Sequence, residues 1–87
     1  PIICEMHTST TFLEYKGGIF EEASVYPVMN HYVEVVGYGV DKGVEYWICR
    51  ESRGTTWGES GFFRIRMHSN NLGIEKQCYW VGTPKLL

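Results

Sequence analysis

A histidine at the start of a hydrophobic run is the side chain in this sequence best placed for chemistry. His31 opens the segment from Asn30 to Gly39, whose residues follow the two-residue period of a β-strand. This period places His31, Val33 and Val35 on one face of the strand. An imidazole at a strand end is held by a rigid element yet remains close to solvent. If this chain carries out chemistry, we expect it to start at His31, and a histidine with a purely structural role at a strand end is the alternative.

Three cysteines and two further histidines could also take part in chemistry. Cys4, Cys49 and Cys78 make an odd count, so the simplest oxidised state has one disulfide and one free thiol, with three possible pairings. Cys49 lies in an apolar run and is most simply a small buried residue. His7 and His68 lack neighbours at ligand spacing and are expected at the surface. Because no CxxC spacing occurs, we expect no structural zinc site. No metal ligand set and no cofactor are expected from the rest of the sequence.

The composition describes a single globular unit over residues 1–87. The sequence has 44% hydrophobic residues and a net charge of −2, from 8 basic and 10 acidic residues without long runs. This balance does not favour nucleic-acid binding, and no apolar stretch has the roughly 20 residues that span a membrane. The apolar start, Pro1-Ile2-Ile3-Cys4, suggests a chain cut from something longer.

The elements that must position these residues are mostly strands. We predict strands at residues 2–4, 19–20, 31–39, 44–50, 61–67 and 78–82. A short helical stretch is expected within 8–18 and a helical turn within 72–77. Residues 40–43 form a hairpin turn, and 51–60 form a long loop. The predicted fold class is α+β and mainly antiparallel β, a partly open barrel or sheet with short helical insertions. The expected core aromatics are Tyr46, Trp47, Phe62, Phe63 and Trp80.

Two long motifs resemble the C-terminal half of papain-like cysteine peptidases. The first is Asn30-His31-x-Val33-x-Val35-Val36-Gly37-Tyr38-Gly39. The second is Glu45-Tyr46-Trp47-Ile48-x-Arg50-x-Ser52-x-Gly54-x-x-Trp57-Gly58-Glu59-x-Gly61-Phe62-Phe63-Arg64-Ile65. Together they cover most of the chain. The resemblance implies the β-barrel half of a two-domain enzyme, whose helical half carries the nucleophilic cysteine and is absent from this chain.

The resemblance also implies a mechanism and a set of partners. In this family a thiolate and an imidazolium form an ion pair, the thiolate attacks the peptide carbonyl, and the imidazolium protonates the leaving amine. His31 matches the family's catalytic histidine. The implied partners are the missing half, or another protein chain, and a peptide substrate. A lysosomal or secreted location is implied by the family.

The residue that orients the histidine differs from the family pattern. Where family members have Asn-Ser-Trp-Gly, this chain has Glu51-Ser52-Arg53-Gly54. The Glu51 carboxylate can accept the imidazole hydrogen bond and would stabilise an imidazolium more strongly than an amide does. Arg53 replaces the covering tryptophan and is expected to pair with Glu51, in competition with His31. The alternative for Glu51 is a solvated loop charge.

The remaining expectations from the resemblance concern the cleft and a disulfide. Asn30, Trp57 and Met6 are assigned to the substrate cleft, with core packing as the alternative for Trp57. Similarity to one cathepsin branch of the family implies a disulfide between Cys4 and Cys78.

Three functions remain open from the sequence. The leading hypothesis is a portion of a cysteine peptidase that supplies His31 and is not catalytically complete alone. The second is a pseudo-peptidase domain used for binding or assembly, which the unusual Glu51 and Arg53 favour. The third is an orphan fragment whose apolar domain face awaits its missing half.

Overall fold

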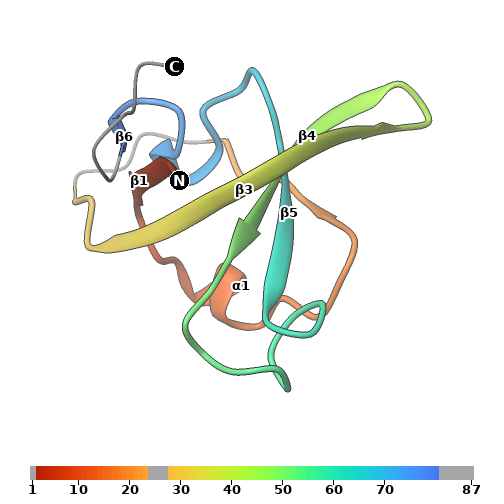
Figure 1. Ribbon diagram of the computed structural model, residues 1–87, viewed down its shortest axis with the longest axis horizontal. Helices are drawn as coiled ribbons and strands as arrows, with labels where there is room; N and C mark the ends of the chain where they lie inside the picture. The colour runs from red at the N-terminus through yellow and green to blue at the C-terminus, as the bar shows by residue number, and fades with distance from the viewer. Residues whose placement is uncertain (1, 24–27, 81–87) are drawn as a thin grey trace, which may run out of the picture.

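The computed structural model describes residues 2–23 and 28–80, which form an open, twisted sheet with one short helix beside it (Figure 1). Its strands are β1 (Ile2–Met6), β2 (Ile19–Phe20), β3 (His31–Asp41), β4 (Val44–Arg50), β5 (Phe62–Arg66) and β6 (Cys78–Trp80). All six predicted strands are therefore present. The end of the last one at 81–82, and part of the loop before Asn30, fall outside the described residues.

The described strands lie in the order β2-β5-β4-β3-β1-β6. Every neighbouring pair is antiparallel except β2 and β5, which run parallel. The predicted mainly antiparallel, partly open sheet is confirmed. The sequence did not reveal the parallel β2–β5 pair, because a strand of two residues carries no signal of its partner.

The β3–β4 hairpin is the longest feature of the sheet and projects beyond it (Figure 1). Its turn residues, Lys42 and Gly43, both have positive φ angles, of 50° and 82°, which match the twist of the flanking strands. A register shift between Val35 and Gly37 marks a bulge in β3. On the His31 side of the bulge, Glu34 pairs with Arg50, the last residue of β4. The next residue, Glu51, therefore lies near the start of β3.

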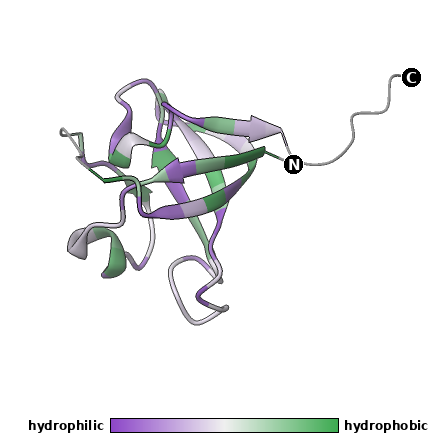
Figure 2. Cartoon of the chain, turned by 90° about the vertical axis from the view of Figure 1, so that its left-hand side faces the viewer, coloured by the Kyte–Doolittle hydropathy of each residue, from purple (hydrophilic) through white to green (hydrophobic). Residues whose placement is uncertain are grey.

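The helical pieces are short, as predicted. Helix α1 spans Thr10–Leu13, and the Ser9 hydroxyl caps it by accepting a hydrogen bond of 3.1 Å from the backbone N–H of Phe12. A 3₁₀ turn, η1, spans Asn71–Gly73. Figure 2 shows hydrophobic and hydrophilic residues alternating along the strands. This alternation leaves one face of the sheet to pack on α1 and η1.

The core lies between the sheet, α1 and η1. Its fully buried side chains include Met6, Phe12, Cys49, Phe63, Ile65, Leu72 and Ile74. The prediction of a core position is wrong for two aromatic residues, since Phe62 is 37% and Trp80 is 62% exposed. Neighbouring residues of a strand point to opposite faces, so Phe63 alone of its pair faces inward. Trp80 lies on the edge strand β6, while Trp47 packs against the core as a partly buried residue.

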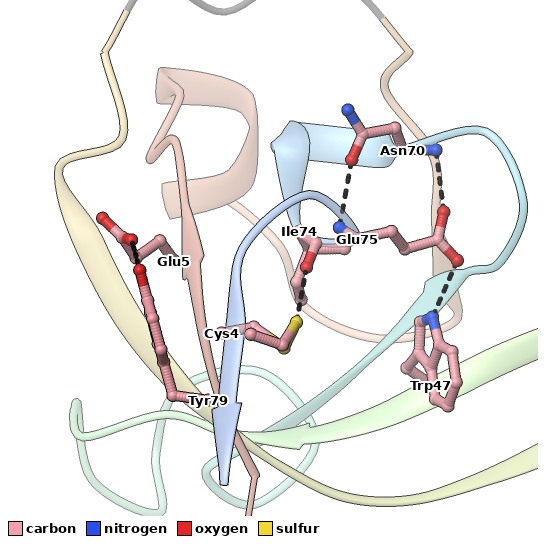
Figure 3. The surroundings of a disulfide bond; sticks show 8 residues. Cys4, Glu5, Trp47, Asn70, Ile74, Glu75 and Tyr79 are labelled. Carbon is pink, nitrogen blue, oxygen red and sulfur yellow. Dashed lines mark hydrogen bonds between the residues drawn. A yellow bond between two sulfur atoms is a disulfide. The ribbon is translucent and has the colours of Figure 1, made fainter.

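The implied disulfide is present between Cys4 and Cys78, which face each other on β1 and β6 (Figure 3). It ties the first described strand to the last one. Next to it, the Tyr79 hydroxyl donates to Glu5 at 2.8 Å, and the Trp47 indole donates to Glu75 at 3.0 Å. The disulfide therefore fixes the edge strand β6 to β1 covalently.

Candidate active site

His31 is positioned by pairing between β1 and β3. It is the first residue of β3 and lies opposite Met6 of β1. The preceding residue, Asn30, donates its backbone N–H to the carbonyl of Met6 at 3.1 Å. The Asn30 side-chain oxygen accepts the backbone N–H of Thr8 at 2.8 Å. Asn30 therefore holds the chain that precedes the histidine.

The imidazole of His31 contacts the carboxylate of Glu51. The Nε2 atom lies 2.8 Å from Oε1 and 3.0 Å from Oε2. The Glu51 side chain is 1% exposed, while that of His31 is 24% exposed. The alternative of a solvated loop charge for Glu51 is therefore wrong. The longer side chain of glutamate still reaches the ring, because Glu51 directly follows β4 beside the start of β3.

Backbone and side-chain contacts hold the Glu51 carboxylate in place. The Glu51 N–H donates to the Gly61 carbonyl at 2.9 Å, and the Ser52 N–H donates to Oε1 at 2.8 Å. The Nε atom of Arg53 lies 3.9 Å from Oε2. The expected pairing with Arg53 is thus present, at a longer distance than the contact with His31. Sequence reasoning missed the role of Ser52, whose only signal was its place next to Glu51.

The geometry assigns the two ring nitrogens different tasks. A carboxylate can only accept hydrogen bonds, so Nε2 carries the proton that faces Glu51. In the neutral ring, Nδ1 then has a free lone pair. Among the described residues, Nδ1 has no hydrogen-bond partner. His31 can therefore accept and return a proton through Nδ1 while Glu51 holds the ring.

The described cysteines are unsuited to act as a nucleophile beside this ring. Cys4 and Cys78 are joined in the disulfide. Cys49 is fully buried, and burial, reinforced by the negative charge of Glu51, raises the pKa of its thiol. A thiol that resists ionisation is a poor nucleophile. The expected buried, structural role of Cys49 agrees with its place in the core.

The residues assigned to the substrate cleft lie in different environments. Met6 is 0% exposed and belongs to the core, so its assignment to the cleft is wrong. It alternates with Glu5 on β1 and points to the inner face. Trp57 is partly buried and packs against Phe12 and Tyr15, with ring centroids at 5.2 Å and 5.5 Å. Its indole donates to the Leu13 carbonyl at 3.2 Å. These contacts give Trp57 the packing role that was the alternative to a place in the cleft.

The two remaining histidines take no part in the pair described above. The His68 side chain is exposed, and its Nε2 lies 3.1 Å from Oε1 of Glu45. His7 is half-buried, and its Nδ1 lies 2.8 Å from the Val28 carbonyl. The expected surface position is therefore confirmed for His68.

A cavity of about 640 Å³ lies beside Glu51, and the sequence did not predict it. Its wall includes Tyr32, Glu34 and Arg50, which point away from the core face of the sheet, together with Phe62. The cavity combines apolar and charged groups on a surface next to the His31–Glu51 pair.

The loop from 51 to 61 is anchored by Glu59, whose contacts the sequence did not reveal. Glu59 accepts hydrogen bonds from the Arg64 guanidinium at 2.9 Å and 2.8 Å and from the Gly18 N–H at 3.0 Å. The hydrogen bonds from Arg64 hold the pKa of the Glu59 carboxyl below its usual value. This anchor joins the loop that carries Glu51 to β5 and to the turn before β2.

Acidification is expected to remove this anchor. Because its pKa is lowered on folding, ionised Glu59 contributes stability that is fully present above the usual value of 4.5 and is lost as the pH falls through the folded value. The melting temperature of the chain should therefore exceed that of Glu59→Gln at neutral pH, and the difference should shrink below pH 4.5. Thermal unfolding followed by circular dichroism measures both. A difference that stays constant on acidification would contradict this role.

The described residues contain neither a membrane-spanning helix nor a cluster of metal-ligating side chains. No helix in residues 2–23 or 28–80 is long and apolar enough to cross a membrane. Within the same ranges, no group of three or more His, Cys, Asp or Glu side chains is placed to hold a metal ion.

Comparisons with known proteins agree on one family. A family model described as papain family cysteine protease matches residues 1–81. Cathepsin B-like CP2 of Giardia intestinalis is 44% identical over 69 residues, which cover 78% of this chain and 23% of the relative. Cathepsin Z of Onchocerca volvulus is 40% identical over 90 residues, which cover 93% of this chain and 29% of the relative. The chain thus spans about a quarter of the length of these curated relatives.

Solved structures of the same family have a similar fold. Digestive procathepsin L 3 from the larval midgut of Tenebrio molitor has a TM-score of 0.81 and 38% identity, over 88% of this chain and 26% of that one. The bromelain protease of Ananas comosus, solved in complex with the E64 inhibitor, has a TM-score of 0.78 and 33% identity, over 88% and 38% of the two chains.

Proposed function

This chain belongs to the papain family of cysteine proteases, and we propose that it supplies the general acid/base histidine of such a protease while a segment outside it supplies the nucleophile. The observation that carries the proposal is the contact of 2.8 Å between Nε2 of His31 and Oε1 of Glu51. This contact occupies one ring nitrogen and leaves Nδ1 available. A buried acceptor on the far side of the ring is the arrangement that a general acid/base histidine requires.

In the proposed reaction, His31 moves one proton twice. Nδ1 takes the proton of a cysteine thiol on the missing segment, and the resulting thiolate attacks the peptide carbonyl. The imidazolium then gives this proton from Nδ1 to the departing amine. Throughout, Glu51 accepts from Nε2 and keeps the ring in one orientation, and Ser52 and Gly61 hold Glu51 in place.

The proposed partners follow from what the chain lacks. The nucleophile-bearing half of a protease, or another protein chain, would complete the site, and the substrate would be a peptide. Trp57 and Asn30 are proposed to border the cleft in the assembled protein. A lysosomal or secreted location is proposed from the family, and the disulfide supports an oxidising compartment.

Within the family, we propose the cathepsin Z branch. Its support is the motifs Pro1-Ile2-x-Cys4, Tyr15-x-Gly17-Gly18-Ile19-Phe20 and Ile74-Glu75-x-x-Cys78. A cathepsin Z sequence is similar over 93% of this chain, although cathepsin B-like sequences reach a comparable identity. The Cys4–Cys78 disulfide, which this branch implied, supports the same assignment.

A second candidate function is a pseudo-peptidase domain used for binding or assembly. The observation that favours it is the Glu51 carboxylate with Arg53 beside it, where the family has an amide and a tryptophan. A carboxylate keeps the imidazolium charged more strongly than an amide does. Such a ring would give up its proton to a leaving amine less readily.

Labelling with a thiol-directed epoxide distinguishes the two functions. Proteomic mapping of the protein that contains this chain first identifies any cysteine on the segment outside it. In the protease, the epoxide should label that cysteine, and His31→Ala should reduce the labelling rate because the thiolate is no longer stabilised. Mass spectrometry locates the label.

The 87-residue chain alone is the matched control. It should remain unlabelled, because Cys49 is buried and the other two cysteines form a disulfide. An outside segment with no cysteine at the nucleophile position would contradict the protease. Labelling that is absent in the native protein but appears after the double change Glu51→Asn and Arg53→Trp would support the pseudo-peptidase instead.

A further inference from the structure

The charge on Glu51 creates a problem for a histidine that must release a proton. We propose that Arg53 is a positioning residue that balances this charge, so that the Glu51–Arg53 pair presents His31 with an acceptor of nearly zero net charge. The inference rests on the proposed role of His31 and adds a residue that sets how readily the ring gives up its proton.

The Glu51 carboxylate contacts the His31 imidazole through both oxygens and has the Arg53 guanidinium near one of them. Nε2 of His31 lies 2.8 Å from Oε1 and 3.0 Å from Oε2 of Glu51, and Nε of Arg53 lies 3.9 Å from Oε2. Glu51 is 1% exposed, whereas the Arg53 side chain is 38% exposed. The carboxylate is therefore screened little by water, and Arg53 approaches it from the solvent side. Among the described residues, Arg53 is the arginine or lysine whose side chain lies within 4.0 Å of the Glu51 carboxylate.

The physical consequence concerns the protonated ring. A buried carboxylate in contact with an imidazole stabilises the charged form of the ring. This helps the ring take a proton from a thiol but opposes its transfer to an amine. A guanidinium near the same carboxylate reduces its net attraction for the imidazolium. Because guanidinium stays charged at any working pH, the balance does not depend on the state of Arg53 itself.

Other ionisable groups lie near Glu51, but they do not balance its charge. Arg50 and Glu34 line the cavity next to Glu51, but neither forms an ion pair with it. The two carry opposite charges and lie opposite each other on β3 and β4. The Cys49 thiol is the other nearby group, and burial raises its pKa so that it stays neutral. Arg53 remains the permanent positive charge beside the Glu51 carboxylate.

Nuclear magnetic resonance of the 87-residue chain tests the proposal without substrate or nucleophile. Ring nitrogen shifts report the ratio of protonated to neutral His31 at a fixed, near-neutral pH. We expect Arg53→Gln to raise this ratio about threefold, because the carboxylate charge is no longer balanced. Arg53→Lys, which keeps the charge, should restore most of the original ratio. Arg53 is largely exposed, so both variants should fold.

A coupled variant and a matched control complete the experiment. In a Glu51→Gln background, Arg53→Gln should change the ratio much less than it does in the native chain, because the charge it balances is gone. Arg66→Gln removes the same charge from an ion pair with Glu21 and should leave His31 unchanged. The proposal is overturned if Arg53→Gln affects His31 no more than Arg66→Gln does. Since no catalysis is involved, this result is independent of whether the assembled protein cleaves peptides.

Discussion

Replacing His31 by glutamine is expected to lower kcat/KM for peptide hydrolysis by about 10³-fold or more in a protein that joins this chain to its nucleophile-bearing half. Glutamine fills a similar volume and can still donate to Glu51, but it cannot carry a proton between a thiol and an amine. The glutamine amide would replace the imidazole N–H in the 2.8 Å contact with Glu51, but the proton transfer at Nδ1 would be lost. Steady-state kinetics with a fluorogenic peptide measures the effect.

His68→Gln is the matched control for this change. His68 also lies near a carboxylate, that of Glu45, at 3.1 Å, but it is exposed in the turn that follows β5. It should retain nearly full activity. Melting temperatures of both variants should remain close to the native value, because neither side chain is a core residue. A His31→Gln protein with native kcat/KM would exclude His31 as the general acid/base.

Removing the disulfide is expected to destabilise the chain by about 4 kcal/mol, from the entropy of closing a long loop in the unfolded state. Cys4 and Cys78 are separated by 74 positions in the sequence, so the bond constrains almost the whole chain. The loss is a large share of the roughly 5–15 kcal/mol that stabilises a typical domain. Urea unfolding of the Cys4→Ala and Cys78→Ala double variant measures the change.

Reducing agent provides the control for that experiment. It should lower the melting temperature of the native chain and leave the double variant unaffected, because Cys49 is a free, buried thiol. A melting temperature of the native chain that does not change under reduction would contradict a stabilising role for the Cys4–Cys78 bond.

The order and approximate limits of the strands were predictable because each has a clear local pattern. The alternation from His31 onward, the Lys42-Gly43 turn and the alternation of β5 are local signals. The errors concern which face is covered. Phe62 and Trp80 were expected in the core and are exposed, while Met6 was expected at the cleft and is buried. Hydrophobicity alone does not identify the face of a strand that another element covers.

The sequence by itself determined that His31 begins a rigid strand and that the chain has the motifs of one protease family. Only the tertiary structure decided which side chain Glu51 contacts. Its distance from His31 depends on how the β3–β4 hairpin returns the chain and on the hydrogen bond from Glu51 to Gly61, contacts between residues far apart in sequence. The physical reason is that a strand's period specifies its own side chains, whereas the partner of a buried charge is set by packing of several elements at once.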